Sequence, residues 1–256
     1  MNSDNGGLRM QRLDTLLVDS GLVDSRSKAQ RLIRQGRVMV DGRTTTKPAA
    51  NVADIAAISI DKGDDYVSRG AYKLVGAIDT FTPLGLPSPQ GLDCLDIGAS
   101  TGGFTQVLLE HGARHVIALD VGHGQLDRRV ADDPRVIRMD GCNIRDVTVA
   151  DLPYRPAMIV SDVSFISLTY VIPVIARIAA PDAAVVLLVK PQFEVGRGNL
   201  GKGGIVEDDG LRRKALADVC ACATACGLDV KATAPSPIEG THGNLEYLLY
   251  ARTATR

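Results

Sequence analysis

Three aspartates in the sequence each end a mainly apolar stretch, and the first of them opens a glycine-rich loop. Asp96 begins the segment DIGASTGGF, and Asp120 and Asp140 end the next two apolar stretches. A dinucleotide-binding loop would have the pattern G-x-G-x-x-G and hold a pyrophosphate, beside which an acid would be repulsive. The acids suit a ligand with cationic and hydroxylated parts, such as S-adenosylmethionine. We therefore predict that this cofactor is bound by residues of the loop and the strand ends: Asp96, Gly98, Ala99, Ser100, Gly102, Gly103, Phe104, Asp120 and Asp140.

Further charged residues border apolar stretches that are expected to be strands. Asp162 comes directly after Met158–Ser161, and Lys190 comes directly after 185–189, which is apolar throughout. A lysine at the end of a buried strand favours a functional role, with a lysine that extends to the surface as the alternative. Glu246 opens the last apolar stretch and, taken alone, is equally well explained as an exposed acid on a strand.

The elements that must position these residues alternate along the chain from Gly91 onward. Apolar stretches of strand length are separated by segments of helical spacing, which predicts an α/β, Rossmann-like fold with a mostly parallel sheet and helices on both faces. Ligands of such sheets bind at the carboxyl ends of the strands, so we expect these charged residues at one edge. The predicted strands span 92–97, 116–119, 136–139, 158–161, 185–189, 230–234 and 246–251, and one predicted helix spans 211–226.

The first 62 residues differ from the rest in charge. They hold ten Lys or Arg against seven Asp or Glu, and within 25–43 six basic residues accompany a single acid, Asp41. A dense run of one sign favours a phosphate-binding surface over a solvated helix face. Apolar spacing predicts one helix that ends at Gly21 and a second that ends at Gly36, then a strand, a hairpin turn and a last strand within 52–62. This stretch is therefore expected to be a small α+β domain.

Composition limits the class of protein. The 256 residues are 45% hydrophobic and 4% aromatic, which suits a large domain and a small one with aliphatic cores. The longest uninterrupted apolar run, 183–189, is far shorter than a membrane span, and the first residues lack the apolar centre of a signal peptide. Five irregularly spaced cysteines indicate a reduced, cytoplasmic protein. Cys222 and Cys226 share a helix face, but buried core positions explain them better than a metal site, so we expect no metal.

The segment from Arg12 to Lys47 resembles the αL, or S-four-type, RNA-binding module. The resemblance rests on the pattern S-R-S-x-A…L-I…G-x-V-x-V-D-G. It implies binding to structured RNA by shape and backbone, without base readout. The RNA contacts expected from the basic residues of this segment are Arg12, Arg26, Lys28, Arg31, Arg34 and Arg37.

The rest of the chain resembles the RrmJ/FtsJ-type ribose 2′-O-methyltransferases. The segments SRGAYKL, SDVSFISL, LVKPQFEVG and GNLEY supply the Lys-Asp-Lys-Glu tetrad of that family as Lys73, Asp162, Lys190 and Glu246. Nearly the whole chain resembles the TlyA family, whose members join the two domains, methylate cytidine 2′-hydroxyls in ribosomal RNA and are often labelled haemolysins. We expect the RNA-binding domain at 1–63, a linker at 64–67 and the methyltransferase domain at 68–256.

The resemblance also implies a division of labour within the tetrad. A ribose hydroxyl must approach the methyl group in line and lose its proton. Lys190 is expected to be the principal base or to stabilise the developing alkoxide. Asp162 would orient Lys190 and lie near the sulfonium, and Lys73 and Glu246 would position the ribose and tune the pair. The chain stops soon after the last strand, where some family members carry an extra basic helix, and the resemblance links this short form to the large ribosomal subunit.

Two features border the tetrad in the sequence. The loop from Gly196 to Gly204 holds five glycines and two bases, Arg197 and Lys202, and is expected to be an RNA-contacting lid or an ordinary surface loop. Phe165 and Phe193 could stack on an extruded base, although core packing is the favoured expectation for each.

Two other classes of function stay open at this point. One is an RNA-binding protein with an inactive methyltransferase domain, which the complete tetrad opposes. The other is a membrane-active haemolysin, which the lack of an amphipathic membrane stripe and of a disulfide pair opposes. We expect a monomer whose partner is ribosomal RNA or a ribosomal subunit, with no membrane partner. The modified nucleotide and the subunit are left open.

Overall fold

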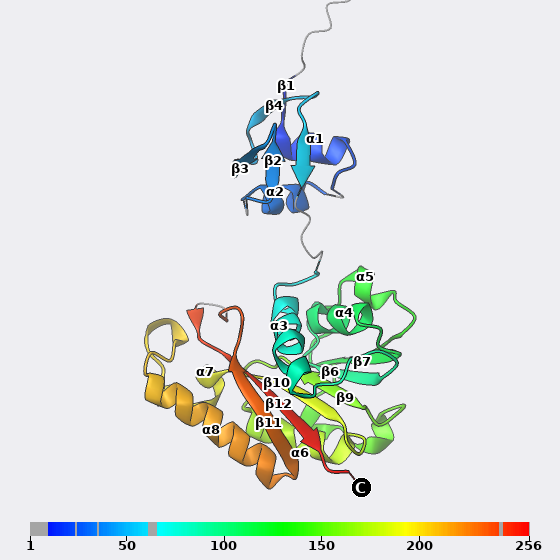
Figure 1. The fold of residues 1–256 in the computed structure, drawn as a ribbon, viewed down its shortest axis with the longest axis vertical. Helices are drawn as coiled ribbons and strands as arrows, with labels where there is room; N and C mark the ends of the chain where they lie inside the picture. Colours follow the sequence, from blue (N-terminus) through cyan, green and yellow to red (C-terminus); the bar gives the residue numbers. More distant parts are fainter. Residues whose placement is uncertain (1–9, 24, 35, 61–65, 241–242, 256) are drawn as a thin grey trace, which may run out of the picture. The chain divides into compact units, whose positions relative to one another are not determined.

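The computed structural model describes residues 10–23, 25–34, 36–60, 66–240 and 243–255. Contacts divide the chain into two units, Met1–Asp65 and Tyr66–Arg256 (Figure 1). Tyr66 and Val67, expected in the linker, are partly buried against the core of the larger unit. Residues 64 and 65 lie outside the described ranges, so the predicted domain boundary stays a prediction.

The small unit packs two helices against short antiparallel strands. Its apolar core is formed by residues that repeat at helical spacing, among them Leu13, Leu17, Ala29 and Ile33. Strand β1 pairs with β4, and β2 lies between β3 and β5. The elements are β1 (Met10–Arg12), α1 (Leu13–Asp19), α2 (Arg26–Arg34), β2 (Val38–Val40), β3 (Arg43–Thr45), β4 (Asn51–Ala53) and β5 (Ile58–Ile60).

One expectation for the small unit is wrong. The sequence predicts a single last strand within 52–62, but this segment holds the end of β4 and the whole of β5. A turn closed by the Ala56 amide, which donates to the Ala53 carbonyl at 3.0 Å, separates them. The two strands therefore pair with different partners, β4 with β1 and β5 with β2.

The large unit is the predicted α/β fold. Within the described residues seven strands form one sheet in the order β11-β12-β10-β9-β6-β7-β8. The helices are α3 (Ala71–Phe81), α4 (Gly103–Glu110), α5 (Arg128–Ala131), α6 (Leu168–Ile178), α7 (Pro191–Glu194) and α8 (Asp209–Ala225). The strands are β6 (Asp93–Ile97), β7 (His115–Asp120), β8 (Val136–Asp140), β9 (Met158–Ser161), β10 (Ala184–Val189), β11 (Leu228–Pro235) and β12 (Tyr247–Thr253). Short 3₁₀ turns lie between these elements at Thr82–Leu84, Ile144–Asp146, Val149–Asp151, Arg197–Asn199 and Lys202–Gly204.

Helices cover both faces of this sheet, as the alternation of elements predicts (Figure 1). One face packs against α6 and α8 through residues such as Ile175 and Val219. The other face packs against α3 and α4 through residues such as Leu74 and Leu108. Strands β10, β9, β6, β7 and β8 are mutually parallel, so their carboxyl ends meet at one edge.

The last strand departs from the parallel pattern. Strand β12 is inserted between β10 and β11 and runs antiparallel to both. Its first residue, Tyr247, pairs with Val189 at the end of β10. The beginning of β12 therefore lies at the same edge as the carboxyl ends of the parallel strands.

Candidate active site

Four charged side chains meet at this edge of the sheet, and they are the four predicted tetrad residues. The Nζ of Lys190 lies 2.6 Å from Asp162 Oδ1. The Nζ of Lys73 donates to Glu246 Oε2 at 2.7 Å and lies 3.9 Å from Asp162 Oδ2. The structure thus places two ammonium groups between two carboxylates, and the lysine and glutamate side chains are nearly all buried.

Four separate elements bring these side chains together. Asp162 directly follows β9, and Lys190 directly follows β10, as expected from the sequence. Lys73 lies in the first turn of α3, a helix whose apolar residues Ala71, Leu74, Ala77 and Phe81 recur at helical spacing and are buried. Sequence analysis did not predict this helix.

The reversed direction of β12 brings in the fourth residue. Glu246 directly precedes β12, so the antiparallel strand starts where the parallel strands end. A Cβ on Gly240 would lie 2.2 Å from Glu246 Oε1, so the glutamate packs directly on this glycine. The site has room for Glu246 because residue 240 has no side chain.

Ser164 is a neighbour of the tetrad that sequence analysis did not select. Its Oγ accepts a hydrogen bond from Lys190 Nζ at 2.8 Å, and it lies two residues after Asp162. Gln192 also approaches the tetrad, with Nε2 3.5 Å from Glu246 Oε1. The segments SDVSF and KPQ contain these residues, but their spacing alone carries no signal for either contact.

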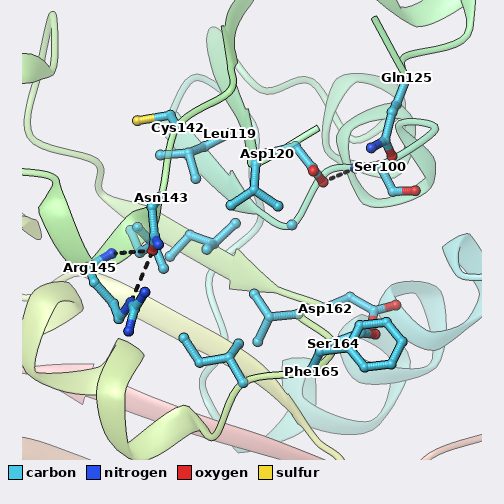
Figure 2. Close-up of a pocket in the computed structure, with 16 residues that line it drawn as sticks. Ser100, Leu119, Asp120, Gln125, Cys142, Asn143, Arg145, Asp162, Ser164 and Phe165 are labelled. Atoms are coloured by element: carbon cyan, nitrogen blue, oxygen red, sulfur yellow. Dashed lines mark hydrogen bonds between the residues drawn. The ribbon is translucent and has the colours of Figure 1, made fainter. Parts of the chain in front are cut away.

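A cavity of about 640 Å³ opens beside the tetrad and extends toward the end of β7 (Figure 2). Asp120 lies in its wall, with apolar neighbours Leu119, Val121 and Ile144. A smaller cavity of about 250 Å³ shares the wall residues Gly98, Ser100, Asp162 and Ser164 with it and contains Lys73 and Lys190. The two cavities together connect the end of β7 with the tetrad lysines.

Asp120 is fixed by backbone groups of two loops. Its Oδ2 accepts from the Ser100 amide at 2.8 Å, drawn as a dashed line in Figure 2, and its Oδ1 accepts from the Gly122 amide at 2.8 Å. The carboxylate is therefore preset at the cavity wall. This arrangement fits a hydroxylated ligand group because a carboxylate with fixed oxygens can still accept hydrogen bonds on its other lone pairs.

The glycine loop approaches neighbouring segments closely. Gly98 has φ +83°, and a Cβ there would lie 3.0 Å from the Asp162 carbonyl oxygen. A Cβ on Gly103 would lie 2.2 Å from Ser68 Oγ, just before α3. Gly98 therefore allows close packing on the segment that follows β9, and Gly103 allows close packing on the start of the helix that carries Lys73.

The structure brings most of the predicted cofactor residues to the cavities. The residues that line one or both of them are Gly98, Ala99, Ser100, Gly103, Phe104 and Asp120. Asp96, Gly102 and Asp140 line neither cavity. Gly102 directly precedes α4 and has φ +96°. Asp140 is exposed, and its Oδ2 accepts from the Gly124 amide at 3.2 Å. A direct contact of these three residues with a cofactor stays a prediction.

Asp96 is fully buried below the loop. Its Oδ2 accepts from Thr105 Oγ1 at 2.7 Å, while Oδ1 has no hydrogen-bond partner among the residues that the structure describes. Burial raises the pKa of this carboxyl to about 7, and the Thr105 hydroxyl opposes the shift. Asp96 therefore contacts the first turn of α4 from within the fold.

A third cavity, of about 680 Å³, lies on the other side of the tetrad. Its wall contains Lys73, Lys190 and Glu246 together with Phe165, Phe193 and residues of the glycine-rich loop. Core packing is the wrong expectation for Phe165, which is 90% exposed and has φ +65°. Its ring centroid lies 5.2 Å from that of the half-buried Phe193.

The glycine-rich loop is connected by hydrogen bonds to Asn244, which lies shortly before β12. The Asn244 Nδ2 donates to the Gly204 carbonyl at 3.1 Å, and its Oδ1 accepts from the Val206 amide at 3.1 Å. Lys202 is exposed on the loop, whereas the side chain of Arg197 lies outside what the structure describes. The loop forms part of the wall of the third cavity through Gly196, Leu200, Gly203 and Gly204.

The predicted RNA-contact residues of the small unit lie at the end of β1, on α2 and directly before β2. Arg12, Arg26, Arg31 and Arg34 are exposed, and Lys28 and Arg37 are half-buried. Within the described ranges, no group of three or more His, Cys, Asp or Glu side chains is placed to hold a metal ion. The described helices also include none that is long and apolar enough to cross a membrane.

Comparisons with known proteins agree with this geometry. Residues 66–253 match the FtsJ-like methyltransferase family, and residues 11–54 match the S4 domain. The chain is 45% identical over 249 residues to the 16S/23S rRNA (cytidine-2′-O)-methyltransferase TlyA of Mycobacterium tuberculosis, covering 96% of this chain and 91% of the relative. It is 43% identical to Hemolysin A of Brachyspira hyodysenteriae, covering 93% of this chain and 98% of the relative.

A solved structure supports the same relationship. A candidate hemolysin from Streptococcus thermophilus superposes with a TM-score of 0.73 at 38% identity, covering 97% of this chain and 90% of that chain. The match covers nearly the whole chain, and the residues matched to the FtsJ-like methyltransferase family include the four charged residues described above. The chain therefore belongs to the TlyA family, in which an S4 domain precedes an FtsJ-like methyltransferase domain.

Proposed function

We propose that this protein transfers a methyl group from S-adenosylmethionine to the 2′-hydroxyl of a cytidine in ribosomal RNA. The observation that carries the proposal is the pair of buried lysines, held by Asp162 and Glu246, at the junction of the cavities. The similarity to a relative named as an rRNA (cytidine-2′-O)-methyltransferase supports the same reaction.

The cavity beside Asp120 has the chemistry to hold the cofactor. The Asp120 carboxylate would accept hydrogen bonds from the ribose hydroxyls, and Leu119, Val121 and Ile144 would pack against the adenine. The Asp162 carboxylate, which lines both cavities on this side, would lie toward the positively charged end of the molecule. When bound, S-adenosylmethionine supplies an electrophilic methyl group on a positively charged sulfur.

Lys190 would act directly on the reacting hydroxyl. As the oxygen–carbon bond forms, the 2′-oxygen must lose its proton, and its negative charge must be stabilised until the proton has left. A neutral Lys190 amine would accept the proton, and a charged one would stabilise the alkoxide. Asp162 at 2.6 Å and Ser164 at 2.8 Å fix the direction of the Nζ. Lys73, held by Glu246 at 2.7 Å, would position the ribose from the other side.

The third cavity would receive the target nucleoside. It contains both lysines of the tetrad, and its volume of about 680 Å³ is in the range of small-molecule pockets. The exposed ring of Phe165 at its edge offers a flat surface on which an extruded base could stack. Lys202 and the glycine-rich loop would contact the RNA next to it.

The S4 domain would supply most of the RNA affinity through its basic residues. We propose a large-subunit ribosomal RNA target, bound by a monomer in the cytoplasm, where ribosomal subunits are found. We propose a reaction without a metal, in which the lysines handle the proton and the charge.

The test is to map 2′-O-methyl marks in ribosomal RNA from a strain that lacks the protein, and from the same strain complemented with wild type or Lys190→Ala. A cytidine mark that is lost on deletion and restored by wild type alone supports the proposal. The position of the mark identifies the subunit.

Two results would contradict the proposal. If no cytidine mark changes, the protein is not a ribosomal RNA 2′-O-methyltransferase under those conditions and an RNA-binding role takes its place. If purified protein lyses red cells while it fails to transfer methyl groups to ribosomal RNA, the haemolysin function takes its place.

A further inference from the structure

The small unit contains a buried carboxylate beneath its basic surface. Asp14 in the first turn of α1 has no exposed side-chain area. Its oxygens accept hydrogen bonds from Nε and Nη2 of Arg12 at 3.0 and 2.8 Å and from Nε of Arg26 at 3.2 Å. An isolated carboxylate would be costly to bury, so these partners explain why an aspartate is tolerated in this position.

The two arginines connect this buried group to solvent. Their side chains are 44% and 57% exposed, although both contact the same carboxylate. A guanidinium group carries five N–H donors. Asp14 uses two donors of Arg12 and one of Arg26, so each arginine keeps donors for a ligand outside the protein.

The same carboxylate is connected to a third basic residue. Gln30 Nε2 donates to Asp14 Oδ2 at 2.8 Å, and Arg34 Nη2 lies 3.4 Å from Gln30 Oε1. Arg12, Arg26 and Arg34 come from the start of α1 and the two ends of α2. Asp14 thus links basic residues that are up to 22 positions apart in the sequence.

We propose that Asp14 is a positioning residue for RNA binding, which holds Arg12 and Arg26 as a preformed two-guanidinium site for an RNA backbone phosphate. This inference rests on the proposed RNA substrate. An unrestrained arginine loses side-chain entropy when a phosphate fixes it, whereas these two are already fixed in the free protein. Arginine suits the task because its planar fork can bind a carboxylate on one side and a phosphate on the other.

Charge alone makes the opposite prediction, which gives the proposal a sharp test. Asp14 contributes a negative charge beside the RNA-binding surface, so removing that charge should strengthen phosphate binding if only electrostatics mattered. Under the proposal, Asp14→Asn weakens binding to 16S and 23S ribosomal RNA transcripts by about tenfold, because two arginines must then be ordered on binding.

The experiment compares Asp14→Asn with Asp19→Asn in the full-length chain. Asp19 lies in the same helix and its side chain accepts from Gln11, so the control removes the same charge without touching an arginine contact to Asp14. We expect Asp14→Asn to raise the KM for RNA with kcat and cofactor affinity unchanged, and Asp19→Asn to bind RNA as tightly as wild type or more tightly.

Circular dichroism shows whether Asp14→Asn folds. If it does not, a second variant tests whether the contact between Asp14 and Arg26 contributes to RNA binding. Arg26→Lys keeps the charge but removes the Nε donor to Asp14, and we expect it to weaken RNA binding by about threefold to tenfold. Asp14→Asn that folds and binds RNA at least as well as Asp19→Asn overturns the proposal, as does Arg26→Lys at wild-type affinity. Wild-type protein that does not bind ribosomal RNA at all overturns both this inference and the proposed function.

Discussion

In the small unit a buried carboxylate, Asp14, contacts two arginines whose guanidinium groups reach solvent. In the large unit two carboxylates contact two lysines, Lys73 and Lys190, that are almost completely buried. Acids therefore organise cations in both units, but the type of cation and its exposure differ. Guanidinium stays charged and offers several donors, which suits phosphate binding at a surface. An ammonium group is compact and can give up its proton, which suits chemistry in a cavity.

The prediction with the largest expected effect concerns the cation in the active site. Lys190→Ala removes the group at the step where oxygen charge develops, and such a loss costs about a hundredfold or more in rate. Lys190→Arg should not restore activity, because guanidinium keeps its proton and has a different shape. The measurement is single-turnover methyl transfer to ribosomal RNA at saturating cofactor. A Lys190→Ala rate within about threefold of wild type, far from the expected loss, would leave Lys73 as the reacting lysine.

A second prediction separates cofactor binding from catalysis. Asp120→Ala removes a fixed carboxylate from the cavity wall, at a cost of roughly 1.5–3 kcal/mol for a charged hydrogen bond, or about tenfold to a hundredfold in affinity. Asp120 also accepts from two backbone amides, so the fold of the variant must be verified by circular dichroism. Calorimetry with S-adenosylmethionine provides the affinity. Wild-type affinity in a folded variant would remove Asp120 from the cofactor site.

A third prediction concerns the exposed arginines of α2. Replacing Arg31 and Arg34 with alanine should weaken RNA binding and reduce the slope of log affinity against log salt by about one unit for each phosphate that the variant no longer binds. Affinity for S-adenosylmethionine, measured on the same double variant, should not change. An unaltered salt slope would mean that these arginines are a solvated helix face, and the contrast between the two units would then rest on Arg12 and Arg26.

The last prediction is on stability and concerns two buried aspartates with opposite surroundings. Burial without a cationic partner raises the pKa of Asp96 to about 7, whereas hydrogen bonds from Arg12, Gln30 and Arg26 lower the pKa of Asp14. A raised pKa means that the folded state holds the proton longer than the unfolded state. The contribution of Asp96 to stability is therefore full below about pH 4 and is lost as the pH rises to about 7.

Asp14 has the opposite dependence on pH. Its stabilising contribution is present above the unfolded pKa of about 4 and is lost as the pH falls below it. Urea unfolding of wild type and Asp96→Asn between pH 4 and pH 8 measures the difference. The unfolding free energy of the wild type should decline between about pH 4 and pH 7, and Asp96→Asn should make this decline less steep. A single proton contributes a slope of at most about 1.4 kcal/mol per pH unit. Parallel curves for the two proteins would contradict this prediction.

Local sequence patterns predicted the residues that directly follow strands. Asp162 and Lys190 lie where expected because a buried parallel strand is a continuous apolar stretch, and its end is visible in the sequence. The place of Glu246 at the start of the last strand was also visible in the sequence, but its assignment to the tetrad depended on the family resemblance. Nothing in the segment GNLEY shows that the following strand is inserted antiparallel between two others, since strand order is set by packing across the whole sheet.

Two other features could not be predicted for related physical reasons. Phe165 is exposed in a loop and has a positive φ. Its apolar side chain alone favours a buried position, so the sequence argued against this exposure. Asp14 lies between core residues Leu13 and Leu16 and resembles an ordinary acid of a first helical turn. Its role became visible when the fold brought Arg26 and Gln30, more than ten residues away, onto its oxygens.

The place of β12 in the sheet also sets the order in which the protein acquires its abilities during synthesis. The described helices and strands of the small unit have all been made once Ile60 has been translated, before any residue that lines the two cavities beside Asp120 and Lys73. The central sheet must wait for the last strand, because β10 and β11 are joined through β12. A nascent chain can therefore present its arginine-rich surface to RNA well before it can transfer a methyl group, since Glu246 and β12 are the last parts of the site to leave the ribosome.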